Sequence, residues 1–158
     1  GNFPLIFFLI LMFIGGCAGS TACGIKIFRV QILTQFFSNQ IKKIIYPHGI
    51  FNLKYENKNI DNKFMSSIIS FIYLYVIIFF ITTALLSITG LDFITSISAA
   101  ATAISNVGPG LGETIGPNGN FSELQDSSKW ILSFAMILGR LELFAVLVLF
   151  IPSFWRKF

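Results

Sequence analysis

The stretch Ser105-Asn106-Val107-Gly108-Pro109-Gly110-Leu111-Gly112, with the apolar segment 92–105 before it, decides the fold of this chain. Residues 92–105 would form a helix about 20 Å long, at about 1.5 Å per residue. The hydrocarbon core of a bilayer is about 30 Å thick, so this helix is too short to cross it and too apolar to lie in water. Non-helical backbone at membrane depth is tolerated only where it is buried in protein or lines a water-filled cavity. We therefore predict a re-entrant loop, in which a pore helix (92–105) enters the membrane and an extended strand (106–112) returns to the same side.

Composition indicates that the whole chain is an integral membrane protein. Of its 158 residues, 54% are hydrophobic and only 11% are charged, against about 25% charged residues in soluble domains. The chain opens at Gly1 with neither a basic segment nor a cleavage pattern, so we expect a C-terminal fragment of a longer protein rather than a signal peptide. No cluster of catalytic or metal-ligating side chains stands out, so we expect neither an enzyme nor a bound cofactor.

Two segments are long enough to cross the bilayer on either side of the re-entrant loop. Residues 66–89 carry no charge over 24 residues, about 36 Å of helix. A second span is predicted at 129–151, with Trp130 and Trp155 at its two membrane interfaces. Residues 66–158 therefore form one predicted unit: span, pore helix, filter strand and span.

The N-terminal part is predicted to be a helix that is interrupted inside the membrane. Residues 15–24 contain four glycines and no bulky side chain, and each glycine costs about 1 kcal/mol in a helix interior. A phosphate-binding loop would need Gly-Lys-Ser/Thr, but Ile25-Lys26-Ile27 follows Gly24. Unwound stretches of this kind often line ion pathways; the alternative is an ordinary interfacial turn. A helical extension to residue 46 and a polar connector (47–65) follow.

The charges predict which side of the membrane each part faces. Seven basic residues lie between Ile25 and Phe64, against Glu56 and Asp61, whereas four acidic residues and one lysine lie between Gly90 and Lys129. By the positive-inside rule, the connector and the C-terminus are cytoplasmic and the re-entrant loop opens outward. This topology also accounts for the formal charge of +4, so no nucleic-acid partner is expected.

The filter strand is predicted to bind a cation through the backbone of Asn106, Val107, Gly108 and Pro109. Glycine has no Cβ, so successive carbonyl groups can turn toward one axis and replace the hydration shell of the ion. The pore helix directs its negative C-terminal end at the same place. The alternative is a glycine-proline surface turn.

Arg140 lies near the middle of the last predicted span, where a charged side chain costs at least about 2.5–3.5 kcal/mol. Glu142 is two residues away and so does not share its helix face. We predict that Arg140 points into a water-filled pore below the filter and acts as a barrier or gate. A structural role, in which it clamps carbonyl groups of the unwound loop, is the alternative, and the two roles are compatible.

Three motifs together resemble the TrkH-type potassium uptake proteins of the Trk/Ktr/HKT cation transporter superfamily, over nearly the whole chain. They are I-G-G-C-A-G-S-T-A-C-G-I-K (14–26), A-T-A-I-S-N-V-G-P-G-L-G-E (101–113), and M-I-L-G-R-L-E-L-F (136–144) with the ending F-I-P-S-F-W-R (150–156). The resemblance implies a pore of four repeats, of which residues 1–46 would be the second span of the third and 66–158 the fourth. One filter strand of four leaves the pore incomplete.

The resemblance also implies roles for individual residues. Gly108 would be the filter glycine, with K⁺ at Asn106, Val107 and Gly108. The gating loop beneath the filter would contain Gly15, Gly16, Gly19, Ser20, Thr21 and Gly24, and Arg140 would work with it.

The function we expect is therefore K⁺ uptake across a bacterial inner membrane by an all-α, multi-pass protein, through a carbonyl filter that the intramembrane loop gates. The alternatives are a Na⁺-selective or K⁺/Na⁺-coupled relative and a non-conducting membrane assembly subunit. Expected partners are K⁺, the lipid bilayer, the remaining repeats of the protein, a second copy in a homodimer and a cytosolic nucleotide-binding regulatory subunit.

Overall fold

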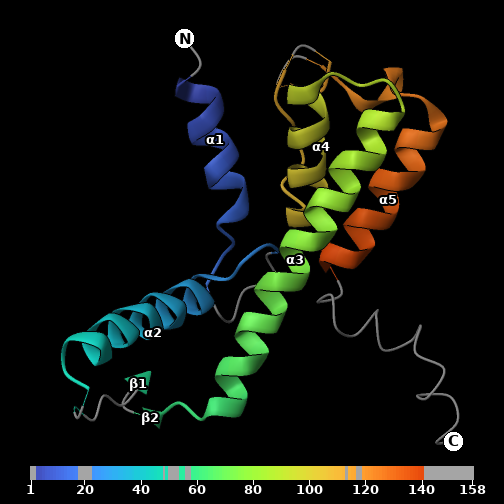
Figure 1. Cartoon of the computed structure of the whole chain (residues 1–158). Coiled ribbons are helices and arrows are strands. Elements are labelled where there is room, and N and C mark those ends of the chain that lie inside the picture. The colour runs from blue at the N-terminus through green and yellow to red at the C-terminus, as the bar shows by residue number, and fades with distance from the viewer. Residues whose placement is uncertain are drawn as a thin grey trace, which may run out of the picture.

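The structure, a computed structural model, describes residues 3–17, 23–47, 49, 54–55, 58–112, 114–116 and 119–140. It is built from helices, as predicted (Figure 1). The helices are α1 (Phe3–Phe13), α2 (Ile27–Ile45), α3 (Asn62–Ile88), α4 (Phe93–Ser105), the short 3₁₀ helix η1 (Phe121–Glu123) and α5 (Asp126–Arg140). The connector also holds a small antiparallel hairpin, β1 (Lys54–Tyr55) and β2 (Lys58–Asn59), which the sequence analysis did not predict.

Among the described helices, α3 is the one that is long and apolar enough to cross a membrane, over Lys63–Ile88. It begins at Asn62, four residues before the predicted start of the span. Large apolar side chains such as Val76, Phe80 and Leu85 are exposed along it. A helix that is apolar all round needs lipid or other apolar helices as its surroundings, so α3 has the character of a membrane span. The last eleven residues of the second predicted span, 141–151, lie outside the described residues.

The short helix α4 is the centre of the packing. It lies against α1, α3 and α5, beside the C-terminal part of α3 (Figure 1). Ten of its 13 residues are buried, among them Ala99, Ala100 and Ala103. Small side chains let helix backbones approach closely. The closest approach is at Gly139 of α5, where a Cβ would overlap the carbonyl of Ile104, so α5 can pack on α4 in this way only with glycine at that position.

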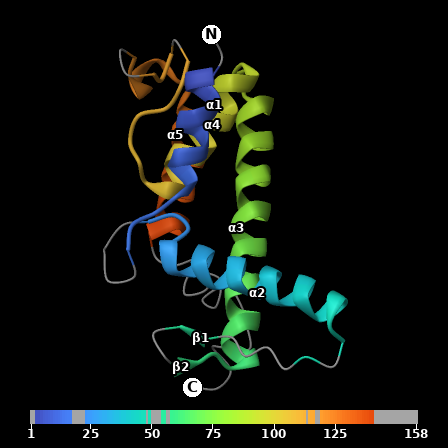
Figure 2. The same cartoon turned by 90° about the vertical axis from the view of Figure 1, so that its left-hand side faces the viewer.

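Helix α2 runs across α3 rather than along it (Figure 2). Ile32 of α2 is buried against Met65 and Ile68 near the start of α3. The guanidinium carbon of Arg29 lies 3.9 Å from the centroid of the Phe71 ring, which is the geometry of a cation–π contact. Helix α2 is therefore fixed at the N-terminal part of α3, whereas α4 packs beside its C-terminal part.

Candidate cation site and gate

The chain reverses direction immediately after α4. Asn106, the residue that ends the helix, has the left-handed conformation (φ 52°, ψ 43°), which asparagine adopts more easily than most residues. Its side-chain Nδ2 donates to the Met136 carbonyl of α5 at 3.1 Å. The Val107 amide donates back to the Thr102 carbonyl at 3.1 Å. Local and tertiary hydrogen bonds thus turn the chain at the C-terminal end of the pore helix.

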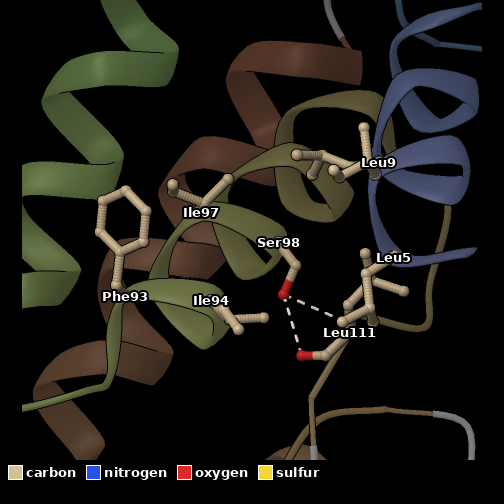
Figure 3. A pocket seen from close by; sticks show the side chains of 8 residues that line it. Leu5, Leu9, Phe93, Ile94, Ile97, Ser98 and Leu111 are labelled. Carbon is tan, nitrogen blue, oxygen red and sulfur yellow. Dashed lines mark hydrogen bonds between the residues drawn. The ribbon is translucent and has the colours of Figure 1, made fainter. Parts of the chain in front are cut away.

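Residues 106–112 then return antiparallel to α4 and are held by its hydroxyl groups. The Gly108 amide donates to Thr102 Oγ1 at 2.9 Å. One turn nearer the start of α4, the Leu111 amide donates to Ser98 Oγ at 3.1 Å and the Ser98 hydroxyl donates to the Leu111 carbonyl at 3.0 Å (Figure 3). The structure therefore has the re-entrant form that the sequence predicted: a helix followed by a strand that returns beside it.

The predicted cation-binding residues lie together on an exposed face of the described structure. Asn106, Val107, Gly108 and Pro109 are all exposed. The amides of residues 107 and 108 are bound to α4, and proline has no amide hydrogen. Between described residues, no hydrogen bond ends on the carbonyl oxygens of residues 106–109. The amides of residues 107 and 108 are thus used to attach the segment to α4, whereas its carbonyls accept no hydrogen bond from a described residue.

The glycines of the strand have different roles. A Cβ on Gly108, whose φ is +113°, would meet no described atom within 4 Å. A Cβ on Gly110 would instead overlap the side chain of Ile115, which is 1% exposed. This buried isoleucine lies outside the pore helix, the filter strand and the two spans that the sequence predicted. Gly108 thus lets the backbone of the exposed segment adopt a positive φ, whereas Gly110 lets Ile115 pack closely against the strand.

Both ends of α4 are fixed, which keeps its C-terminal end at the carbonyl segment. At the start, Asp92 Oδ2 accepts a hydrogen bond from the Thr95 amide at 3.3 Å. Hydrogen bonds from Thr95, chiefly through its side chain, hold the pKa of the Asp92 carboxyl below its usual value. At the other end, the buried hydroxyls of Ser105 and Tyr75 (α3) are hydrogen-bonded at 2.6 Å. The partial negative charge of the helix C-terminus therefore stays beside residues 106–109, where it favours a cation.

Sequence reasoning did not select the residues that hold the strand, although a signal for them exists. Ser98, Thr102 and Ser105 are spaced by four and three residues, and this spacing puts side chains on one face of a helix. A row of hydroxyls on an otherwise apolar short helix predicts that something polar lies along it. In this structure that polar neighbour is the backbone of residues 108–111 and the Tyr75 hydroxyl.

Two apolar cavities lie beside the strand, and their lining side chains are not cation ligands. The first, of about 290 Å³, lies between α1 and α4, and Ser98 is its one polar lining side chain (Figure 3). The second, of about 410 Å³, is lined by apolar residues of α1, by Ile14 just after it, and by Val107, Pro109, Gly110 and Leu111. The cation ligands that this region offers are therefore backbone carbonyls.

The predicted gating loop is closed at its base by backbone hydrogen bonds. The Gly15 amide donates to the Ile25 carbonyl at 3.0 Å, and the Ile27 amide donates to the Gly16 carbonyl at 3.2 Å. A Cβ on Gly15 would lie 2.5 Å from the Cys23 carbonyl oxygen, and Gly24 is buried with φ +83°. The described parts of this segment are non-helical. Gly19, Ser20 and Thr21 lie outside the described residues.

Arg140 reaches this loop from the other end of the chain. Its Nη1 donates to the Cys23 sulfur at 3.8 Å. The structure thus brings the predicted gating arginine to the base of the predicted gating loop, 117 residues away in the sequence. Glu142 lies outside the described residues.

This fold and this site define the class: an α-helical membrane protein with a re-entrant pore helix and a return strand that begins with exposed residues. The family model of TrkH, described as a cation transport protein, matches residues 2–157, and the chain belongs to this family. The resemblance that the three motifs indicated is thereby confirmed.

Several relatives of this chain carry names that agree with this family. The Trk system potassium uptake protein TrkI of Halomonas elongata is 45% identical over 161 residues, which cover 99% of this chain and 32% of that protein. TrkG of Escherichia coli K12 is 36% identical, over 97% of this chain and 31% of that protein. The crystal structure of the potassium transporter TrkH from Vibrio parahaemolyticus matches with a TM-score of 0.87 and 32% identity, over 98% of this chain and 32% of that one. The chain thus spans less than a third of the length of these relatives.

Proposed function

We propose that the complete protein containing this chain takes up K⁺ across a bacterial inner membrane, and that residues 106–109 form one strand of its selectivity filter. One observation carries this proposal. The amides of residues 107 and 108 are tied to α4, whereas the carbonyls of 106–109 accept no hydrogen bond from a described residue and lie on an exposed face. Carbonyl oxygens in this arrangement can replace the water around a cation.

The choice of K⁺ rests on the relatives. TrkI of Halomonas elongata and TrkH of Vibrio parahaemolyticus are both named as Trk system potassium uptake proteins. A single carbonyl strand cannot surround an ion, so the proposal includes further strands from the rest of the protein. A homodimer and a cytosolic nucleotide-binding regulatory subunit are proposed as partners from the family resemblance.

We also propose that the loop at residues 15–24 and Arg140 form the gate. The contact between Arg140 Nη1 and the Cys23 sulfur supports this proposal, because it puts a positive charge against the base of the loop. A positive charge beside a cation pathway raises the energy of a passing cation. Movement of the loop would move the arginine and so change that barrier.

The test is uptake of radioactive Rb⁺, with Na⁺ as competitor, in cells that lack their own K⁺ uptake systems and express the complete protein. Gly108→Ser should weaken the discrimination of K⁺ over Na⁺. Gly108 has φ +113°, and an L-residue in the left-handed region costs roughly 1–2 kcal/mol. Serine would therefore turn the backbone and displace the neighbouring carbonyls.

The matched control is Gly90→Ser. Gly90 also has a positive φ (+89°) and no described atom within 4 Å of a Cβ, but it lies at the end of α3, outside the filter strand. We expect it to keep the wild-type ion preference. Unchanged preference in Gly108→Ser would contradict the filter assignment. Uptake dominated by Na⁺ would favour the Na⁺-selective relative, and no uptake by the inserted protein, even with cytosolic extract, would favour the assembly subunit.

A further inference from the structure

The hydroxyl row on α4 contains one member that touches the proposed cation site directly. Ser98, Thr102 and Ser105 are all buried. Ser98 binds Leu111, beyond the carbonyl segment, and Ser105 binds Tyr75 of α3. Thr102, which is fully buried, accepts the Gly108 amide at 2.9 Å. Among these three hydroxyls, the one that hydrogen-bonds to the segment 106–109 is therefore that of Thr102.

This hydrogen bond fixes the direction of a carbonyl group. The peptide unit is planar and trans, so the Gly108 N–H and the Val107 C=O point in opposite directions from the same plane. Because the Gly108 N–H points at Thr102 on α4, the Val107 carbonyl points away from α4. Val107 is itself 46% exposed. The Val107 carbonyl thus points away from the helix that holds the strand, as a ligand for an ion in a pore must.

Thr102 holds two consecutive amides with two different groups. Its backbone carbonyl accepts the Val107 amide at 3.1 Å, and its side-chain oxygen accepts the Gly108 amide at 2.9 Å. Between described residues, no other hydrogen bond restrains the Val107–Gly108 peptide. Glycine tolerates both positive and negative φ, so Gly108 would let this peptide rotate if the hydroxyl were removed.

We propose that Thr102 is a positioning residue of the cation site, whose hydroxyl holds the Val107 carbonyl toward the ion and thereby contributes to the discrimination of K⁺ over Na⁺. The inference rests on the proposed function. Filter selectivity depends on the size of the site or on the number and strength of its carbonyl ligands. If the Val107 carbonyl turned away from the ion, the site would change in size and would lose one of its carbonyl ligands.

The experiment compares Thr102→Val with Thr102→Ser in the complete protein, by Rb⁺ uptake over a series of Na⁺ concentrations. Valine keeps the shape of threonine and leaves the backbone carbonyl of residue 102 in place, so it removes only the bond to Gly108. We expect the preference for Rb⁺ over Na⁺ to fall about threefold to tenfold, the range expected for one hydrogen bond. Serine keeps the hydroxyl and should keep the wild-type preference.

Thr82→Val is the matched control. Thr82 is also buried in a helix, but its hydroxyl donates to the Ile78 carbonyl of its own helix α3 at 2.8 Å. This control should keep the wild-type ion preference. An equal shift in Thr82→Val would overturn the inference, because the loss of any buried hydroxyl would then suffice.

Three further outcomes are decisive. A wild-type preference in Thr102→Val, in a protein that transports Rb⁺, overturns the inference and leaves the proposed function standing. Absence of K⁺-selective uptake in the wild type contradicts the proposed function and the inference with it. If Thr102→Val does not accumulate in the membrane, Thr102→Ala replaces it in the comparison with Thr102→Ser, and equal ion preference in that pair overturns the inference.

Discussion

At the scale of single residues, the proposed cation site separates groups that face the ion from groups that hold them. The exposed segment 106–109 contributes backbone carbonyls. The buried Thr102 hydroxyl holds the Gly108 amide of this segment, and the buried Ser98 hydroxyl holds the Leu111 amide that follows it. The glycines divide in the same way, because Gly108 borders open space whereas Gly110 lies against Ile115. The glycines of this motif therefore meet two different requirements, a positive φ at Gly108 and close packing at Gly110. The sequence alone does not show which glycine meets which requirement.

The proposed gate depends on the positive charge of Arg140, so a substitution that removes this charge tests it. Arg140→Ala should raise the resting Rb⁺ flux of the complete protein severalfold, because removing a positive charge near the pathway lowers the barrier for a cation. The measurement is Rb⁺ efflux from preloaded cells, normalised to the amount of inserted protein.

The control for this charge is Lys129→Ala. Lys129 is on the same helix α5, and its Nζ lies 3.2 Å from Asp126 Oδ1 at the beginning of the helix. This change removes the same charge without touching the loop and should leave the resting flux unchanged. Reduced insertion of Arg140→Ala without any rise in flux per molecule would indicate that Arg140 is only a structural clamp.

At the scale of elements, α4 can enter the protein interior because its side chains are small and its two ends are satisfied. Alanine, serine and threonine make up most of it, and Gly139 allows α5 to approach the Ile104 carbonyl. Asp92 accepts the Thr95 amide at the start, and the left-handed Asn106 closes the end. Its small buried side chains and its two satisfied ends thus let this helix occupy the centre of the packing.

The Asp92 cap predicts a dependence of stability on pH. Its folded-state pKa is lowered, so its contribution is fully present above the unfolded pKa of about 4 and is lost as the pH falls through the lower folded value. Wild type should therefore be more stable than Asp92→Asn at pH 7, and this difference should shrink as the pH falls through the folded-state pKa of Asp92. Asp92→Ala should lose about 0.5–2 kcal/mol at pH 7. Thermal unfolding of the complete protein in detergent measures these differences.

Asp61→Asn is the control for the cap. Asp61 occupies the same position before α3, but its side chain makes no capping hydrogen bond. Its substitution should change the stability by less than that of Asp92, at pH 7 and at pH 3. A difference between wild type and Asp92→Asn that is the same at pH 7 and pH 3 would show that the carboxylate charge does not stabilise α4.

At the scale of the whole molecule, most of the described basic residues and most of the described acidic residues lie at opposite ends of α3. Lys26, Arg29, Lys42 and Lys43 lie on or next to α2, which crosses the N-terminal part of α3 (Figure 2). Asp92, Glu123 and Asp126 lie in the segments that follow its C-terminal end (Figure 1). In the structure, the charge asymmetry of the sequence thus runs along α3, and we predict from the positive-inside rule that α2 faces the cytoplasm.

This orientation predicts the accessibility of two exposed glutamines to a membrane-impermeant thiol reagent. In a background with Cys17 and Cys23 replaced by alanine, Gln125→Cys should be labelled in intact spheroplasts. Gln40→Cys should be labelled only after the membrane is permeabilised. Both residues are exposed, Gln125 just before α5 and Gln40 on α2.

Labelling of both positions after permeabilisation is the internal control, because it shows that each thiol can react. The reverse pattern, with Gln40→Cys labelled in intact spheroplasts, would contradict the proposed orientation. It would leave the fold unaffected, since the packing of α4 on α3 and α5 does not depend on which side faces outward.

The sequence by itself determined the class of fold and the place of the proposed cation site. A helix of apolar residues that is too short to cross a bilayer, followed by alternate glycines, leaves few physical options at membrane depth. The same local information located α3, the non-helical residues around Gly15 and Gly24, and the carbonyl segment at 106–109. These features depend on hydrophobicity, length and glycine, which act over a few residues.

Only the tertiary structure decided what holds the site in place. The bonds from Thr102 to Gly108 and from Tyr75 to Ser105, and the contact between Arg140 and Cys23, join residues 6, 30 and 117 positions apart. Which hydroxyl faces which amide depends on how the strand returns along α4, and this depends on the packing of α5, through Gly139, and of Ile115 against Gly110. A hydrogen bond is short and directional, so its partners are defined only when the helices are in their final positions.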